Sequence, residues 1–134
     1  ITMKIEFEQP LSFRMEVVET DDHAASMRVE VKIIVAQFQH TFGYEGAFWI
    51  ACENWDEFKG ALGSLETEAA VLQDMNGYFA LGVHQDSSGL WLSWDCTKDD
   101  LGGGKKTKIA FSSRIDDDIF GQIKNKFLEF PSWW

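Results

Sequence analysis

The sequence predicts an α+β fold in which a mostly antiparallel sheet, strongly curved or two-layered, packs with two helices. Between residues 3 and 35, apolar and polar side chains alternate with the period of two that is typical of half-buried strands. Residues 55–65 and 119–128 repeat their apolar side chains with a helical period instead. Asn-Gly, Ser-Gly and Gly-rich turns separate further strand-like runs in the second half.

The N-terminal part predicts strands that are joined by short turns. Alternating apolar residues mark residues 3–7, 13–17 and 27–35. The pattern breaks at Gln9-Pro10, and the polar residues 20–23 predict the tip of a hairpin. This alternation is typical of an antiparallel sheet that has one face on the core and one face in water.

Residues 43–65 predict a turn, a buried strand and the first helix. Gly43 and Gly46 indicate a turn at 43–46, and residues 47–52, apolar throughout, predict a central strand covered on both faces. Asn54 is predicted to cap the helix, and Glu57 follows three residues later as in a capping box. The apolar residues of this helix share one face: Trp55, Phe58, Leu62 and Leu65.

The second half predicts four more strands and a C-terminal helix. The predicted strands are residues 69–74, 78–85, 90–96 and 105–113, separated by turns at 76–77 and 86–89 and by a flexible loop at 99–104. Asp116, Asp117 and Asp118 supply a cap and the negative charge that favours a helix N-terminus. Pro131 ends this helix and leaves Trp133 and Trp134 at the terminus.

The composition predicts one domain over residues 1–134. The chain of 134 residues shows no internal repeat and no low-complexity linker, and its 45% apolar content with 11 Phe and 6 Trp supports a hydrophobic core. Cys52 and Cys96 form no metal-type spacing, so we expect buried free thiols in a reducing compartment, with a single disulfide as the alternative. No apolar stretch is long enough to span a membrane, and the N-terminus alternates rather than forming a signal core, so we expect a cytoplasmic protein.

The strongly acidic charge restricts the kinds of partner. The 22 Asp and Glu outnumber the 12 Lys and Arg, which gives a formal net charge of −10. Nucleic acids and anionic membranes are recognised by basic patches, so both are excluded as expected partners. A basic protein would be attracted by this charge, although acidity that only aids solubility explains the composition equally well.

The residues that carry chemistry form no recognisable active site. The run from Gly102 to Thr107 lacks the spacing of a phosphate-binding loop, and a strand pattern follows it. The sequence 21–23, Asp-Asp-His, is explained by a turn better than by a metal site. His40, His84 and Ser93 have no nucleophile signature around them. We therefore expect no catalytic residues, no metal ligands and no cofactor, and a function in binding rather than catalysis.

Two groups of residues are candidates for contacts with a partner. Asp95, Asp99 and Asp100 lie in acidic segments near strand ends and could meet a basic protein, although a role in turns is the alternative. Trp133 and Trp134 lie at the chain end, where burial in the core is less assured, so they could anchor an interface.

From about Met27 onward, the order of hydrophobic positions resembles small bacterial toxin-immunity proteins, in particular the WapI-like immunity group. The residues that carry the resemblance are Phe48-Trp49-Ile50, then Trp55, Phe58, Leu62 and Leu65, then Tyr78-Phe79-Ala80-Leu81, Leu90-Trp91-Leu92-Ser93-Trp94 and Phe127-Leu128-Glu129-Phe130-Pro131. The first strands and the Gly-rich loop depart from that pattern. The resemblance implies a cytoplasmic protein that binds and blocks one cognate toxin domain, and nuclease toxins of this kind are often basic. The alternative is a carrier that holds a small ligand in the aromatic-lined mouth of a curved sheet. The sequence leaves the identity of the toxin and the oligomeric state open.

Overall fold

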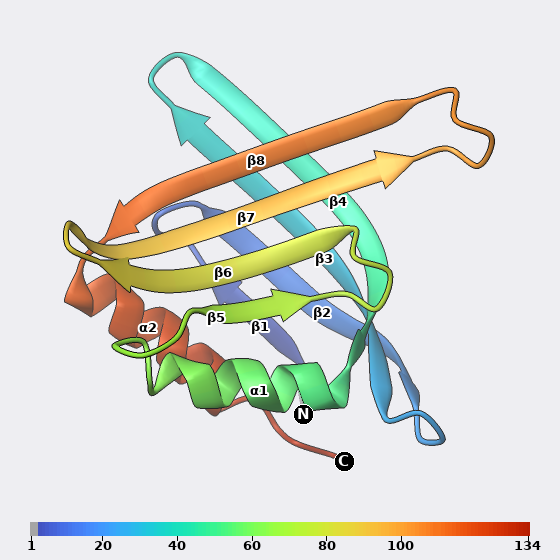
Figure 1. The fold of residues 1–134 in the computed structure, drawn as a ribbon, viewed down its shortest axis with the longest axis horizontal. Helices are drawn as coiled ribbons and strands as arrows, with labels where there is room; N and C mark the ends of the chain where they lie inside the picture. Colours follow the sequence, from blue (N-terminus) through green and yellow to red (C-terminus); the bar gives the residue numbers. More distant parts are fainter. Residues whose placement is uncertain (1–2) are drawn as a thin grey trace.

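In the computed structural model, which describes residues 3–134, two four-stranded antiparallel sheets pack with two helices (Figure 1). The first sheet contains β1 (Lys4–Phe7), β2 (Ser12–Asp21), β3 (Ser26–Gln37) and β4 (His40–Ala51) in chain order. The second contains β5 (Ala70–Gln73), β6 (Phe79–Asp86), β7 (Gly89–Asp99) and β8 (Lys106–Ile115), also in chain order. Helix α1 (Cys52–Leu62) follows β4, and α2 (Asp117–Leu128) follows β8. The predicted α+β class is confirmed.

Each half of the chain has the same order of elements, although the sequence shows no repeat. Four strands form a meander and a helix follows the last strand, first as β1 to α1 and then as β5 to α2. Alternation of apolar and polar side chains is enough to specify such a meander. The two halves therefore share an arrangement without sharing an amino-acid pattern.

The two sheets lie face to face with their strands crossing, and their inner side chains form the core (Figure 1). Phe48 of β4 stacks on Phe79 of β6, with ring centroids 4.8 Å apart. Buried side chains from both sheets and both helices belong to one continuous cluster. Helix α1 packs against β5 and α2 contacts β1, so the helices lie along one side of the stacked sheets.

Helix α1 turns aromatic residues toward α2 and the core, as its sequence predicts. Trp55, Phe58 and Leu62 are buried. Phe127 of α2 lies 5.4 Å from Trp55 and 4.9 Å from Phe58 between ring centroids. Leu65 is also buried, but α1 ends at Leu62, so Leu65 lies in the turn beyond the helix rather than on its face.

The predicted cap at Asn54 is wrong, because α1 begins two residues earlier, at Cys52. The amide of Cys52 donates to the carbonyl of Ala25 at 2.8 Å, so a neighbouring turn satisfies part of this helix start without a side-chain cap. Asn54 instead accepts a hydrogen bond from the Gln73 amide at 2.9 Å, which links α1 to β5. The cap predicted for α2 is confirmed, since Asp116 accepts from the Ile119 amide at 2.7 Å.

The predictions for residues 43–52 are also wrong in two respects. No turn interrupts this segment, because β4 pairs with β3 without a break and the chain reverses at Phe38-Gln39. Gln39 takes the positive φ of 63° that the reversal needs. Gly46 serves packing instead, because a Cβ there would collide with the ring of Tyr44. Furthermore, β4 is an edge strand and not a central one.

Cys52 and Cys96 are both buried free thiols, as predicted, although Cys52 opens a helix rather than lying in a strand. Among the described residues, neither helix is long and apolar enough to cross a membrane.

We predict that Phe58→Ala lowers the free energy of unfolding by about 3–5 kcal/mol, because it removes a fully buried ring from the contact with Phe127. Leu128→Ala, at a position on α2 that is 44% exposed, is the control and should cost far less. Urea denaturation of both variants measures the difference. Equal costs would show that the aromatic face of α1 is not part of the core.

We predict that neither thiol reacts with a thiol reagent in the native protein and that both react in denaturant without prior reduction. Burial raises the pKa of Cys52 to about 11 and also raises the pKa of Cys96, so little reactive thiolate exists at neutral pH. A count of reactive thiols before and after unfolding checks this. Reactivity that appears only after reduction would demonstrate a disulfide.

Candidate partner-binding surface

The structure does not bring the predicted contact residues together. Asp95 lies exposed in the middle of β7, Asp99 ends that strand, and Asp100 follows in the loop before β8. Trp133 and Trp134 lie after α2, near α1 and away from the β7–β8 loop (Figure 1). These residues therefore belong to two separate surfaces.

The β7–β8 hairpin carries both signs of charge. Asp99 is the register partner of Lys106, and the amide of Asp100 donates to the carbonyl of Lys105 at 3.0 Å. Lys98 lies on the same hairpin with its ammonium group 4.3 Å from the centre of the Tyr78 ring. Asp99 and Asp100 are thus surrounded by lysines, and the hairpin is not a purely acidic patch.

The two C-terminal tryptophans pack on the protein itself. Both are half-buried against the core, and their rings meet edge to face with centroids 5.6 Å apart. The Trp134 indole N–H donates to Oδ2 of Asp56 on α1 at 2.9 Å. Packing of the chain end accounts for these contacts, and the rings keep some exposed surface.

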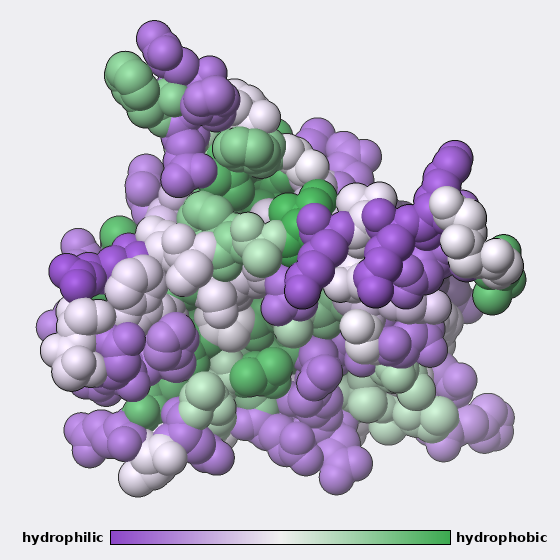
Figure 2. All heavy atoms as spheres, turned by 45° about the horizontal axis from the view of Figure 1, so that its top comes forward, coloured by the Kyte–Doolittle hydropathy of each residue, from purple (hydrophilic) through white to green (hydrophobic). Residues whose placement is uncertain are grey.

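An apolar cleft that the sequence did not reveal lies between the two sheets. Its volume is about 370 Å³, and it opens where the β3–β4 hairpin extends past β8. Figure 2 shows apolar side chains gathered between projecting, mostly polar segments. The cleft is lined by Val35, Gln37, Phe42, Trp94, Lys108, Ile109, Ala110 and Phe111. These residues come from two hairpins, β3–β4 and β7–β8, that are far apart in sequence, so no local pattern could have indicated the cleft.

Exposed apolar side chains stand at the tips of the hairpins that flank this cleft. Phe38, at the β3–β4 reversal, is 88% exposed, and Phe42 on the same hairpin is 52% exposed. Leu101, in the β7–β8 loop, is fully exposed. The two tips project in different directions (Figure 1), so they are two separate exposed apolar points, one on each hairpin that lines the cleft. A signal for Phe38 was present in the sequence, because it is a lone aromatic in a polar turn.

Two polar aromatic residues line the inner end of this region. The ring of Trp94 lies 5.6 Å from that of Tyr44, and its buried indole N–H has no acceptor within the described chain. Trp94 is only 3% exposed. A buried donor without a partner is uncommon, because leaving it unpaired costs about 1–3 kcal/mol.

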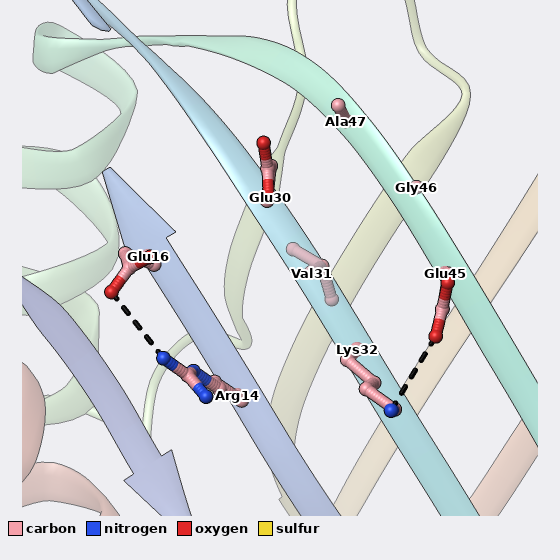
Figure 3. A pocket seen from close by; sticks show the side chains of 8 residues that line it. All are labelled: Arg14, Glu16, Glu30, Val31, Lys32, Glu45, Gly46 and Ala47. Atoms are coloured by element: carbon pink, nitrogen blue, oxygen red, sulfur yellow. Dashed lines mark hydrogen bonds and ion pairs between the residues drawn. The ribbon is translucent and has the colours of Figure 1, made fainter. Parts of the chain in front are cut away.

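A hollow on the outer face of the first sheet is lined by charged residues of both signs (Figure 3). It contains two ion pairs, Arg14 with Glu16 along β2 at 3.4 Å and Lys32 with Glu45 between β3 and β4 at 3.5 Å. Glu30 stands directly across the strands from Glu16, and no cation in the described chain pairs with it. Like charges in register disfavour the isolated sheet slightly.

His84 and Ser88 are not arranged for nucleophilic catalysis. Ser88 donates to Asp86 at 2.6 Å, while Nε2 of His84 lies 4.0 Å from the other oxygen of Asp86. The hydrogen bond from Ser88 is the main cause that lowers the pKa of Asp86. The aspartate therefore separates the serine from the histidine. No group of three or more potential metal-binding side chains occurs within residues 3–134.

Comparisons with family models, with curated proteins and with solved structures found no match to this chain.

We predict that stability falls as pH rises from about 10 to about 12. Burial raises the pKa of Tyr44 from 10.0 to about 12, so the phenol ionises more readily in the unfolded chain than in the folded one. The stabilising contribution is complete below the unfolded pKa and is lost as pH rises through the folded value. Urea denaturation across this pH range measures the decline, and Tyr44→Phe should reduce it. An identical decline in that variant would contradict the assignment.

Proposed function

We propose that this protein is a binding protein that neutralises a cognate bacterial toxin domain in the cytoplasm. The observation that carries the proposal is the apolar cleft between two hairpins whose projecting tips expose Phe38 and Leu101. Aromatic and aliphatic side chains that project from a rigid sheet are suited to fill pockets in a partner. A basic toxin domain is the proposed partner because of the net charge of −10 and the resemblance to immunity proteins.

The proposed function depends on the shape and charge of the protein surface and not on catalytic residues. A binding protein needs no nucleophile or general base. His84, Asp86 and Ser88 are not arranged as a catalytic triad. The acidic residues at Asp95, Asp99 and Asp100 lie on the hairpin whose tip carries Leu101, so they would border this interface. Trp133 and Trp134, near α1, would lie outside it.

A small-ligand carrier is the second candidate, and the cleft favours it. A volume of about 370 Å³ is within the usual range for ligand sites, and the lining combines Phe42, Trp94 and Phe111 with few polar groups. Native mass spectrometry of the purified protein separates the two functions. A bound small molecule that is lost on Phe111→Asp would favour a carrier.

The binding test uses the C-terminal domain of a large secreted toxin whose gene lies directly upstream. We expect Phe38→Ser and Leu101→Ser each to accelerate dissociation about tenfold, because each removes an apolar anchor at the interface. Leu128→Ser is the matched control, since Leu128 is an exposed leucine on α2, and it should leave dissociation unchanged. Surface-plasmon kinetics measure all three.

Association in the same experiment reports on charge. The rate should fall as salt rises, and reversing Asp99 and Asp100 to Lys should slow association more than it speeds dissociation. An association rate that is unchanged both by added salt and by the Asp99 and Asp100 reversal would exclude electrostatic docking. No binding to the toxin domain, or no such toxin gene, would refute the immunity function, and the carrier would then be preferred.

A further inference from the structure

The two sheets together have four edge strands, and three of them are protected. Helix α2 contacts β1, and α1 packs along β5, where Asn54 accepts a hydrogen bond from the Gln73 amide. The β8 edge carries Lys106, Lys108 and Arg114, and lysine on an edge discourages pairing with another chain. Natural proteins protect edges in these ways because free amides and carbonyls attract other strands.

Strand β4 has none of these protections along most of its length. It contains no lysine, arginine or proline, and it pairs only with β3 among the described residues. At its C-terminal end the carbonyl of Trp49 accepts from the Met75 amide at 2.8 Å, so this carbonyl points away from β3. Because the direction of the backbone groups alternates along an antiparallel strand, the groups of Thr41, Gly43, Glu45 and Ala47 also point to the free edge.

Gly43 supports the idea that another chain approaches this edge. A Cβ at this position would have open space around it, and its φ is not positive, so nothing in the protein itself requires glycine there. A glycine within a strand weakens the strand and is common where another backbone comes close. At Gly46, by contrast, the Tyr44 ring occupies the space that a Cβ would need, so glycine is required there by the protein's own packing.

The residues around the free edge of β4 define which kind of peptide segment could bind there. On the outer face, Glu45 is the carboxylate that β4 itself carries; it is 74% exposed and lies 3.5 Å from Lys32 of β3 in the mixed-charge hollow of Figure 3. On the inner face, Figure 1 shows β7 and β8 crossing β4 and extending beyond it. Ile109 of β8 lines the apolar cleft together with Phe42 of β4. An added strand would meet the exposed carboxylate of Glu45 with one face and apolar side chains with the other.

We propose that an extended segment of the partner protein, about seven residues long with alternating basic and apolar side chains, adds to the free edge of β4 beside Thr41, Gly43, Glu45 and Ala47. This inference rests on the proposed function, because it describes how the toxin domain is held. A second copy of this chain is disfavoured as the occupant, since two chains of charge −10 repel each other.

Amide hydrogen exchange of the unmodified protein, with and without the toxin domain, tests the proposal. In the free protein, the amides of Thr41, Gly43, Glu45 and Ala47 should exchange fast, while those of Phe42 and Tyr44, bonded to β3, should be protected. Binding should slow the four edge amides about tenfold or more. Tight binding without this slowing would overturn the edge proposal and leave the proposed function standing, whereas absence of binding would overturn both.

Two pairs of variants add matched controls. Gly43→Pro removes the edge amide and should weaken binding about tenfold, whereas Gly43→Ala keeps the amide, adds only a Cβ beside the bound strand and should weaken binding less. Glu45→Lys should weaken binding more than Glu57→Lys on α1, although both change the net charge equally. Equal effects within both pairs would contradict the proposal. Exchange on the unmodified chain remains decisive even if Gly43→Pro does not fold.

The same measurements identify a second copy as the occupant. Edge amides that are already protected in the isolated protein, together with a dimeric mass in sedimentation, would show that β4 pairs with itself and would overturn the assignment to a partner.

Discussion

The stacking of the two sheets on each other is the contact on which the other features of the molecule depend. Phe48 lies on Phe79 with 4.8 Å between centroids, and Tyr44 joins Phe79 to Trp94 through contacts of 5.9 and 5.6 Å. Because each meander is apolar on only one face, neither sheet could bury that face alone. Crossing of the strands follows from the stack, and it leaves the β3–β4 and β7–β8 hairpins projecting beyond the opposite sheet (Figure 1).

The helices make the two sides of this stack unlike. Trp55 and Phe58 of α1 meet Phe127 of α2, and Phe130 lies 4.7 Å from Trp55, so aromatic rings fill the side next to β1 and β5. The opposite side, bounded by β8 and most of β4, contains the apolar cleft. Apolar lining and backbone groups therefore remain uncovered on the side of β4 and β8, where the proposed partner would bind.

Charge and shape contribute differently to the proposed recognition. The net charge of −10 acts at a distance and favours encounters with a basic partner. Charges of both signs occur at the surface itself. Lys98 and Lys106 accompany Asp99 on one hairpin, while Glu16 and Glu30 face each other on the first sheet. Local features such as Phe38, Leu101 and the edge of β4 are therefore better suited to define which partner binds.

The sequence by itself determined the class of fold, most of the strands and the buried faces, because these depend on periodicity within short segments. Asp116 as a cap and Phe58 as a core residue were both predictable, since a cap and an apolar stripe are local features. Only the tertiary structure decided which strands are edges and that Asn54 accepts a hydrogen bond from the Gln73 amide, because each depends on a distant segment. The cleft beside Trp94 follows the same rule: its walls come from β3, β4, β7 and β8, and their meeting depends on how the sheets cross.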